Sequence, residues 1–155
     1  MGDDVAVKAR LSELHAVALT LFGEARNEPI AGVIAVANVI ENRAKHSGFG
    51  RKTEVHKRAQ FSCWSPAGGP AEQHNHAVVM AAAAELLAGV KVSAPGYARC
   101  QTVADVLLAD ALTDLTGGAR HYCTTALLKV APPTWAMGRT ASVVIGAHSF
   151  FVGVA

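Results

Sequence analysis

The stretch LFGEARNEP, residues 21–29, lies between two apolar, periodic segments and marks the first corner of the chain. Apolar residues recur every three or four positions from about 9 to 26, which predicts a helix with one buried stripe. A similar pattern follows from about 30 to 45. Because Pro29 suits a first helical position and disfavours helical backbone in the residue before it, the two helices should meet at a tight corner.

Glu24 flanks the buried stripe near the C-terminal end of the first predicted helix. The helix dipole is negative there, so an ionised carboxylate at this point costs stability. Lost hydration beside apolar residues also disfavours the ionised form, which favours a role in donating a proton. A surface glutamate paired with Arg26 or Arg43 is an equally favoured interpretation from these residues alone.

Residues 46–73 contain several glycines and prolines and little periodicity, which predicts a long loop. Its middle, QFSCWS at 60–65, is aromatic and is therefore expected to be packed or to face a ligand. A third helix is expected at about 74–88. A fourth is expected at about 102–111, where Thr102 and Asp105 resemble a capping pair.

Two β-prone segments, 120–124 and 143–145, follow a Gly-Gly pair and predict a small antiparallel sheet. The whole chain, 1–155, is therefore expected to form a single α+β domain that is mainly α. Its 51% apolar and 17% charged residues exclude a disordered chain and supply a hydrophobic core.

The net charge of +2 is spread along the chain, whereas nucleic-acid binders more often carry a dense basic stripe. The nearest approach to one, residues 43–58, is interpreted as a solvated, mobile basic loop. No nucleic-acid partner is expected. Salt-sensitive DNA binding through this stretch would be needed to support the alternative of a small basic nucleic-acid protein.

The three cysteines, Cys63, Cys100 and Cys123, are odd in number and show no CxxC spacing, which is typical of reduced thiols. A nucleophilic Cys63 or Cys123 with His121 as its base lacks a protease signature, and buried inert thiols are favoured. The tripeptide at 74–76, His-Asn-His, is interpreted as solvated residues at a helix start rather than as a metal site. No metal and no cofactor are expected.

Five blocks of sequence, in order, closely resemble the SleB-type cell-wall hydrolases, which are the spore-cortex-lytic enzymes and their phage and prophage relatives. They span about residues 21–150, and the block at 60–64 is similar to the phage branch. The blocks are LFGEARNEP at 21–29 with AVANVI at 35–40 and NR at 42–43, QFSCW at 60–64, GGARHY at 117–122, PTWA at 133–136 and IGAHSF at 145–150.

The resemblance implies a lysozyme-like, two-lobed fold that cleaves peptidoglycan glycan strands between N-acetylmuramic acid and N-acetylglucosamine. It also implies that Glu24 is catalytic. The related spore enzymes are lytic transglycosylases that leave a 1,6-anhydromuramic end. A muramidase-type hydrolase that uses water is the alternative, and a non-catalytic wall-binding phage structural protein is the rival from another class. Glu28 is interpreted as a structural residue at the corner rather than as a second catalytic acid.

Substrate-binding positions also follow from the resemblance, although core anchoring explains the aromatic residues equally well. Tyr122 is expected to hydrogen-bond the substrate or Glu24, or to pack in the core, and His148 is expected to fix the terminal strand. Cys123 stands where the family usually has Asn or His, which puts a polar role there in doubt. The implied substrate-binding residues are Phe61, Ser62, Trp64, Thr116, Gly117, Gly118 and Tyr122.

The N-terminus is acidic, and no apolar run reaches the ~18 residues that span a bilayer. We therefore expect a monomer that is made in the cytoplasm without a signal peptide and does not insert into membranes. It would reach the cell wall or periplasm after release, as a phage endolysin or a wall-remodelling factor. A leader removed from the sequence is the other explanation, and the residues do not separate the two.

Overall fold

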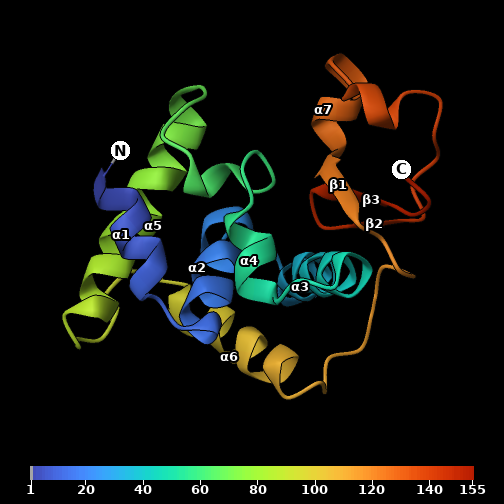
Figure 1. The fold of residues 1–155 in the computed structure, drawn as a ribbon. Coiled ribbons are helices and arrows are strands. Elements are labelled where there is room, and N and C mark those ends of the chain that lie inside the picture. The colour runs from blue at the N-terminus through green and yellow to red at the C-terminus, as the bar shows by residue number, and fades with distance from the viewer. Residues whose placement is uncertain (1) are drawn as a thin grey trace.

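The computed structural model describes residues 2–155, which form a mainly helical structure with one small sheet (Figure 1). This confirms the predicted α+β, mainly α class. The helices are α1 Gly2–Arg10, α2 Glu13–Ala25, α3 Ile30–Ser47, α4 Arg51–His56, α5 Pro70–Leu87, α6 Tyr97–Leu108 and α7 Thr125–Val130. Two 3-10 turns, η1 Ser62–Trp64 and η2 Thr134–Ala136, accompany the strands β1 His121–Thr124, β2 Val143–Ile145 and β3 His148–Phe151.

The predicted corner between α2 and α3 is present. Pro29 occupies the N-cap of α3 with φ −58° and ψ 159°, so the backbone leaves helical geometry there. The amide of Glu28 still donates to the carbonyl of Ala25 at 2.9 Å, which keeps the turn tight. Helix α3 ends at Ser47 and is capped by Gly48, whose φ of +76° favours glycine.

The predicted helix at 9–26 was wrong at its start. The hydroxyl of Ser12 accepts a hydrogen bond from the amide of His15 at 3.1 Å, so Ser12 caps a helix that begins at Glu13. A separate helix, α1, precedes it. Leu11 between the two helices is only 2% exposed, and this buried apolar residue kept the periodic pattern unbroken across the cap.

The predicted loop at 46–73 was also wrong in part, because it contains α4 and η1. Helix α5 begins at Pro70 rather than near 74, with the proline in the first turn, where its missing N–H does no harm. The basic stretch at 43–58 is not a solvated loop. It runs from α3 into α4, and Arg51 within it pairs with Glu41, Glu13 and Asp110.

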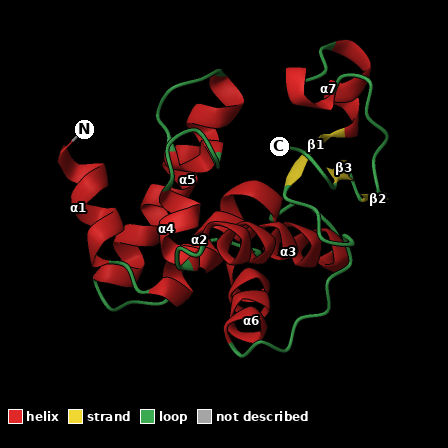
Figure 2. Ribbon diagram, turned by 45° about the vertical axis from the view of Figure 1, so that its right-hand side comes forward, coloured by secondary structure: helices red, strands yellow, loops and turns green. Residues whose placement is uncertain are grey.

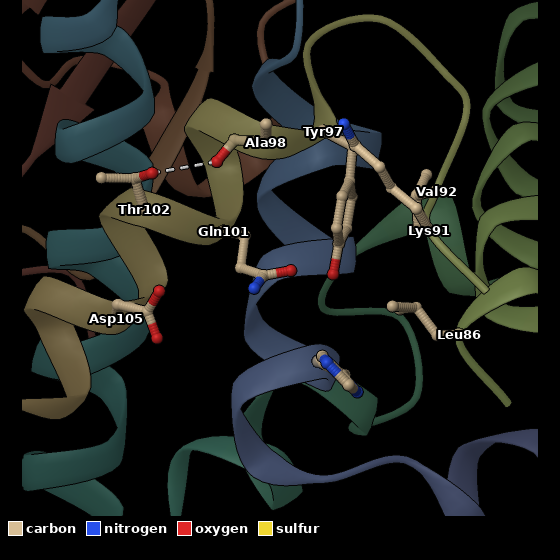
Figure 3. Close-up of a pocket in the computed structure, with 9 residues that line it drawn as sticks. Leu86, Lys91, Val92, Tyr97, Ala98, Gln101, Thr102 and Asp105 are labelled. Atoms are coloured by element: carbon tan, nitrogen blue, oxygen red, sulfur yellow. Dashed lines mark hydrogen bonds between the residues drawn. The ribbon is translucent and has the colours of Figure 1, made fainter. Parts of the chain in front are cut away.

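The fourth predicted helix begins earlier and ends earlier than expected, as α6 at Tyr97–Leu108. Gly96, with φ +87°, turns the chain into this helix. Thr102 is therefore not a capping residue. It lies inside the helix, where its hydroxyl donates to the carbonyl of Ala98 at 3.1 Å (Figure 3).

The sheet has the strand order β1-β3-β2, with every pair antiparallel. Both predicted strand segments are confirmed, but they do not pair with each other. The third strand, β3, lies between them, so that Tyr122 pairs with Phe150 and Val144 pairs with Ser149. Strand β3 is buried along its whole length, which explains its central position.

The core consists of two hydrophobic clusters, of which the larger extends from the helices into the sheet. The larger cluster unites the helices α2 to α6 and includes Phe22, Val36 and Phe150. The smaller one lies around Cys123 and Phe151 in the sheet lobe, which we define as residues 121–151. In Figures 1 and 2 this lobe, with α7 at its outer end, stands beside α3. The two-lobed arrangement is as predicted. That residues 1–155 form a single domain stays a prediction. Within residues 2–155, none of the helices combines the length and the apolarity that a bilayer crossing requires.

Candidate active site

A groove of about 690 Å³ has walls from both lobes. The helical side contributes Glu24 from α2, Arg43 from α3, residues 59–62, 65 and 67–69, and Glu72 from α5. The sheet lobe contributes residues of β1 together with Leu127 and His148. An open groove lined by both lobes suits a long polymer better than a small ligand, which usually binds in an enclosed pocket.

The carboxyl group of Glu24 is half-buried in this groove and is held from two sides. Its Oε1 accepts a hydrogen bond from the amide of Cys63 at 3.1 Å, and its Oε2 accepts one from the hydroxyl of Tyr122, also at 3.1 Å. Each carboxylate oxygen can accept two hydrogen bonds, so either oxygen has room for a further partner. The arrangement fixes the carboxyl group between η1 and β1.

The amide of Cys63 reaches Glu24 because η1 lies directly against α2. A Cβ atom at Gly23 would lie 2.4 Å from the Cβ of Cys63, so a glycine is required for this approach. The indole of Trp64 pins the same turn by donating to the hydroxyl of Thr20 at 2.8 Å. A glycine and a buried tryptophan therefore position the first donor.

The second donor, Tyr122, is fixed by aromatic neighbours. Its ring stacks on Phe150 with centroids 5.6 Å apart and meets the ring of His148 edge-on at 5.1 Å. Burial, and then the negative charge of Glu24, raise the pKa of Tyr122 well above its ordinary value. The phenol therefore stays protonated and donates a hydrogen bond to the carboxyl group of Glu24.

Arg43 adds a positive charge to the groove. Its Nε donates to the carbonyl of Arg120 at 2.7 Å, and its guanidinium lies 4.9 Å from the ring centre of Phe61. Burial lowers the pKa of Arg43, while the negative charges of Glu54 and Glu24 act in the opposite direction. Its Nη1 is buried and has no hydrogen-bond partner among residues 2–155. Arg43 is thus part of the groove wall rather than the surface partner of Glu24 that the sequence allowed.

Glu28 is engaged elsewhere, which supports its interpretation as a structural residue. Its Oε1 accepts a hydrogen bond from the amide of Ala147 at 3.0 Å and lies 2.7 Å from Nδ1 of His148. These contacts tie the α2–α3 corner to the start of β3. His148 therefore fixes the terminal strand, as expected, and it also lines the groove.

Three of the predicted substrate-binding residues, Phe61, Ser62 and Tyr122, line the groove together with Glu24. Phe61 is buried there, whereas Ser62 is exposed. Trp64 does not line it. Its indole is 4% exposed, is bonded to Thr20 and packs edge-on against His56 at 4.6 Å, so its anchoring role explains the position.

The predicted binding residues Thr116, Gly117 and Gly118 do not line the groove either. Thr116 is buried, and its hydroxyl donates to Asp114 at 2.7 Å. The amide of Gly118 donates to the same carboxylate at 2.9 Å, and both glycines have positive φ. This segment is a tight turn organised by Asp114, which is a structural reason for a Gly-Gly pair.

The cysteines are free and buried. Burial, and then the charge of Glu24, raise the pKa of the Cys63 thiol well above its ordinary value. Burial raises the pKa of Cys100 to about 11 and also raises that of Cys123. A protonated thiol is a poor nucleophile, so these environments do not suit cysteine catalysis.

The tripeptide at 74–76 is only partly solvated, which corrects our interpretation of it. His74 is exposed, but Asn75 accepts a hydrogen bond from Arg26 at 2.7 Å. His76 lies 3.2 Å from the carbonyl of Cys63 and 3.3 Å from Asp4. Asn75 and His76 thus help to attach α5 to its neighbours.

A separate hollow of about 380 Å³ lies between α6 and the end of α5 and shares no lining residue with the groove (Figure 3). Its one carboxylate, Asp105, belongs to an exposed residue of α6. Tyr97 also lines it, and burial raises the pKa of this phenol to about 12. Chemistry at neutral pH is therefore better supported in the groove, where a carboxyl group meets two donors.

A glutamate held in an open groove between two lobes is what an enzyme needs for proton transfer to a polymeric substrate. The family model described as cell wall hydrolase matches residues 27–151, beginning three residues after Glu24. The chain belongs to this family, and it is a peptidoglycan-cleaving enzyme.

Two solved structures share its fold. The catalytic domain of the germination-specific lytic transglycosylase SleB from Bacillus anthracis is 23% identical, with a TM-score of 0.57 over 91% of this chain and 96% of that one. The catalytic domain of the Bacillus cereus SleB protein is 22% identical, with a TM-score of 0.56 over 89% of this chain and 88% of that one. A search of curated proteins gave no match.

Proposed function

We propose that the chain is a lytic transglycosylase that cleaves glycan strands between N-acetylmuramic acid and N-acetylglucosamine, with Glu24 as its general acid and base. The observation that carries this proposal is the carboxyl group of Glu24, which lies in the groove between the amide of Cys63 and the hydroxyl of Tyr122. The Bacillus anthracis protein of the same fold is a lytic transglycosylase, which supports the choice of reaction.

One carboxyl group is enough for this reaction. Glu24 gives its proton to the glycosidic oxygen as the bond from that oxygen to the anomeric carbon breaks. The resulting carboxylate then takes the proton of the sugar's own 6-hydroxyl while the oxygen of that group bonds to the anomeric carbon. No water is consumed, and Glu24 ends as it began. The amide of Cys63 and the hydroxyl of Tyr122 stabilise the negative charge that develops on Glu24 as the glycosidic bond breaks, which lowers the barrier.

A hydrolase would need a second carboxyl group, usually about 5 to 9.5 Å from the first. Glu28 is occupied by Ala147 and His148, so it is a poor candidate. Glu72 at the start of α5 does line the groove, with its carboxyl group packed close to Gly69. Glu72 therefore keeps the muramidase-type hydrolase as a second candidate function.

The test is digestion of purified wall by the wild type, Glu24→Gln and Glu72→Gln, followed by mass spectrometry of the fragments. We expect 1,6-anhydromuramic ends from the wild type, a loss of about 10²- to 10⁴-fold in Glu24→Gln, and little change in Glu72→Gln. Reducing ends that vanish in Glu72→Gln would establish the hydrolase instead. Equal cleavage by Glu24→Gln and the wild type would overturn both mechanisms, and the absence of any cleavage by the wild type would favour a non-catalytic wall protein.

We also infer that the enzyme serves as a phage or prophage endolysin, acting on the wall after release from the cytoplasm. The resemblance of residues 60–64 to the phage branch supports this role. We further propose that the enzyme acts as a monomer. Lysis of cells that co-express the enzyme with a pore-forming protein, but not of cells that express it alone, tests the role. Size-exclusion chromatography tests the monomer.

A further inference from the structure

Beside the groove lies another hollow, of about 250 Å³, which we call the basic pocket. It shares Ala59, Phe61 and Ser65 with the groove, so the two are neighbours along one wall. Its remaining lining comes mainly from α1 and the end of α4 and includes Lys8, His56, Lys57 and Arg58. A substituent on a glycan unit bound in the groove therefore has a short path into the basic pocket.

The basic pocket carries an excess of positive charge. Lys57 pairs with Glu54 at 2.6 Å, and the one acidic residue of the lining, Asp4, lies 3.3 Å from His76. No carboxylate of residues 2–155 forms an ion pair with Lys8 or Arg58. Their two charges are therefore available to an anionic ligand.

His56 adds a hydrogen-bonding group without a charge. Its Nε2 is buried and has no hydrogen-bond partner in the part of the chain that the structure describes. Burial, and then the charges of Lys8 and Lys52, lower the pKa of His56 to about 4, so the ring is neutral at pH 7. A buried polar nitrogen without a partner costs stability, and a bound ligand would satisfy it.

The positive surface continues beyond the basic pocket. An adjoining hollow of about 390 Å³ shares Lys8, His56 and Lys57 with it and adds Lys52. The Nζ of Lys52 is held by the carbonyls of Ala9 and Leu11, which fixes its charge in place. The charge thus extends away from the groove as a track rather than as an isolated site.

We propose that the basic pocket binds the free carboxylates of the peptide stem on a muramic acid seated in the groove. This rests on the proposed function, because it needs a glycan strand bound beside Glu24. The stem leaves the sugar ring through the lactyl group and carries carboxylates several bonds away. A cationic track that begins at the groove and leads outward from it matches this geometry and charge. The enzyme therefore selects stem-bearing glycan over stripped strands.

The test compares kcat/KM on stem-bearing glycan with kcat/KM on strands whose stems an amidase has removed. The wild type should prefer stem-bearing strands by about 2- to 30-fold, the range that two exposed ion pairs supply. The double variant Lys8→Gln, Arg58→Gln should bring this ratio close to one, and so should 0.5 M salt, because exposed charges are screened. Lys91→Gln, which changes a cation outside the groove and the basic pocket, should keep the wild-type ratio.

The stripped strands keep a lactyl carboxylate, so they separate recognition of the stem from recognition of the sugar acid. Equal loss on both substrates in the double variant would overturn the proposal, as would the absence of a preference in the wild type. If neither substrate is cleaved, the proposed function itself fails. The pocket is then tested alone by adding the tripeptide L-Ala–γ-D-Glu–diaminopimelate and following the ring resonances of His56. Shifts in the wild type that are lost in the double variant support the pocket, and their absence refutes it.

Discussion

The hydrogen bond from Tyr122 to Glu24 offers the sharpest test of the proposed mechanism. Tyr122→Phe removes the hydroxyl that lies 3.1 Å from Oε2 of Glu24 and nothing else. The phenyl ring keeps its stack on Phe150 and its edge contact with His148, so the fold should be retained. The substitution therefore separates support of the carboxylate from packing.

The size of the effect follows from when the carboxylate is charged. A hydrogen bond to a charged group contributes about 1.5–3 kcal/mol. In the mechanism above, Glu24 becomes ionised as it protonates the leaving oxygen, so this stabilisation is gained as the barrier is crossed. Since 1.36 kcal/mol corresponds to a tenfold rate, kcat should fall by about 10- to 150-fold.

The assay is the rate of muropeptide release from purified wall, measured by liquid chromatography at saturating substrate. Thermal unfolding of both proteins controls for damage to the fold. Glu24→Gln sets the lower limit of activity. A kcat for Tyr122→Phe within twofold of the wild type, with an unchanged melting temperature, would refute the idea that the phenol supports the carboxylate during catalysis.

Three other substitutions or reactions test the walls of the site. Gly23→Ala should lower the free energy of unfolding by about 1–3 kcal/mol, because the added Cβ would overlap Cys63. An unchanged midpoint in a denaturant titration would contradict this prediction. Trp64→Phe should cost about 1 kcal/mol through the lost bond to Thr20 and leave KM unchanged, whereas a raised KM would restore Trp64 as a sugar-binding residue. At pH 8.5 an ordinary cysteine is half ionised. Cys63 should nevertheless resist iodoacetamide in the folded protein and react after unfolding, because its burial and raised pKa keep it a thiol. Rapid alkylation of Cys63 in the native state, detected by mass spectrometry, would contradict this.

The parts of the fold that sequence predicts are those with a strong local signal. Pro29 marks the corner between α2 and α3, and the β-prone segments at 120–124 and 143–145 mark two strands. The break at Ser12 was not predicted, because the buried Leu11 before the cap continues the apolar period of the helix that follows. Helix α4 escaped because six residues are too few to show a helical period.

The site is harder to predict than the fold because its groups come from distant parts of the chain. Tyr122 lies 98 positions from Glu24, and only the resemblance to a family suggested that they face each other. The other donor is the backbone amide of Cys63, which any residue except proline could supply, so no side-chain pattern reports it. The family resemblance implied that Trp64 binds substrate, with core anchoring equally favoured. In the structure its ring is buried and anchors the turn that presents this amide.

The position of Glu24 explains why these supports are needed. The last turn of α2 points carbonyl oxygens toward its C-terminal end, where a negative charge is disfavoured. Arg26 covers two of these carbonyls, since its Nη1 donates to Phe22 at 3.3 Å and to Gly23 at 3.1 Å. Cys63 and Tyr122 then supply donors to the carboxylate itself. One set of contacts relieves the helix end and the other stabilises the ionised acid. Both sets of contacts hold the carboxyl group of Glu24 in one place, as the proposed mechanism with a single acid and base requires.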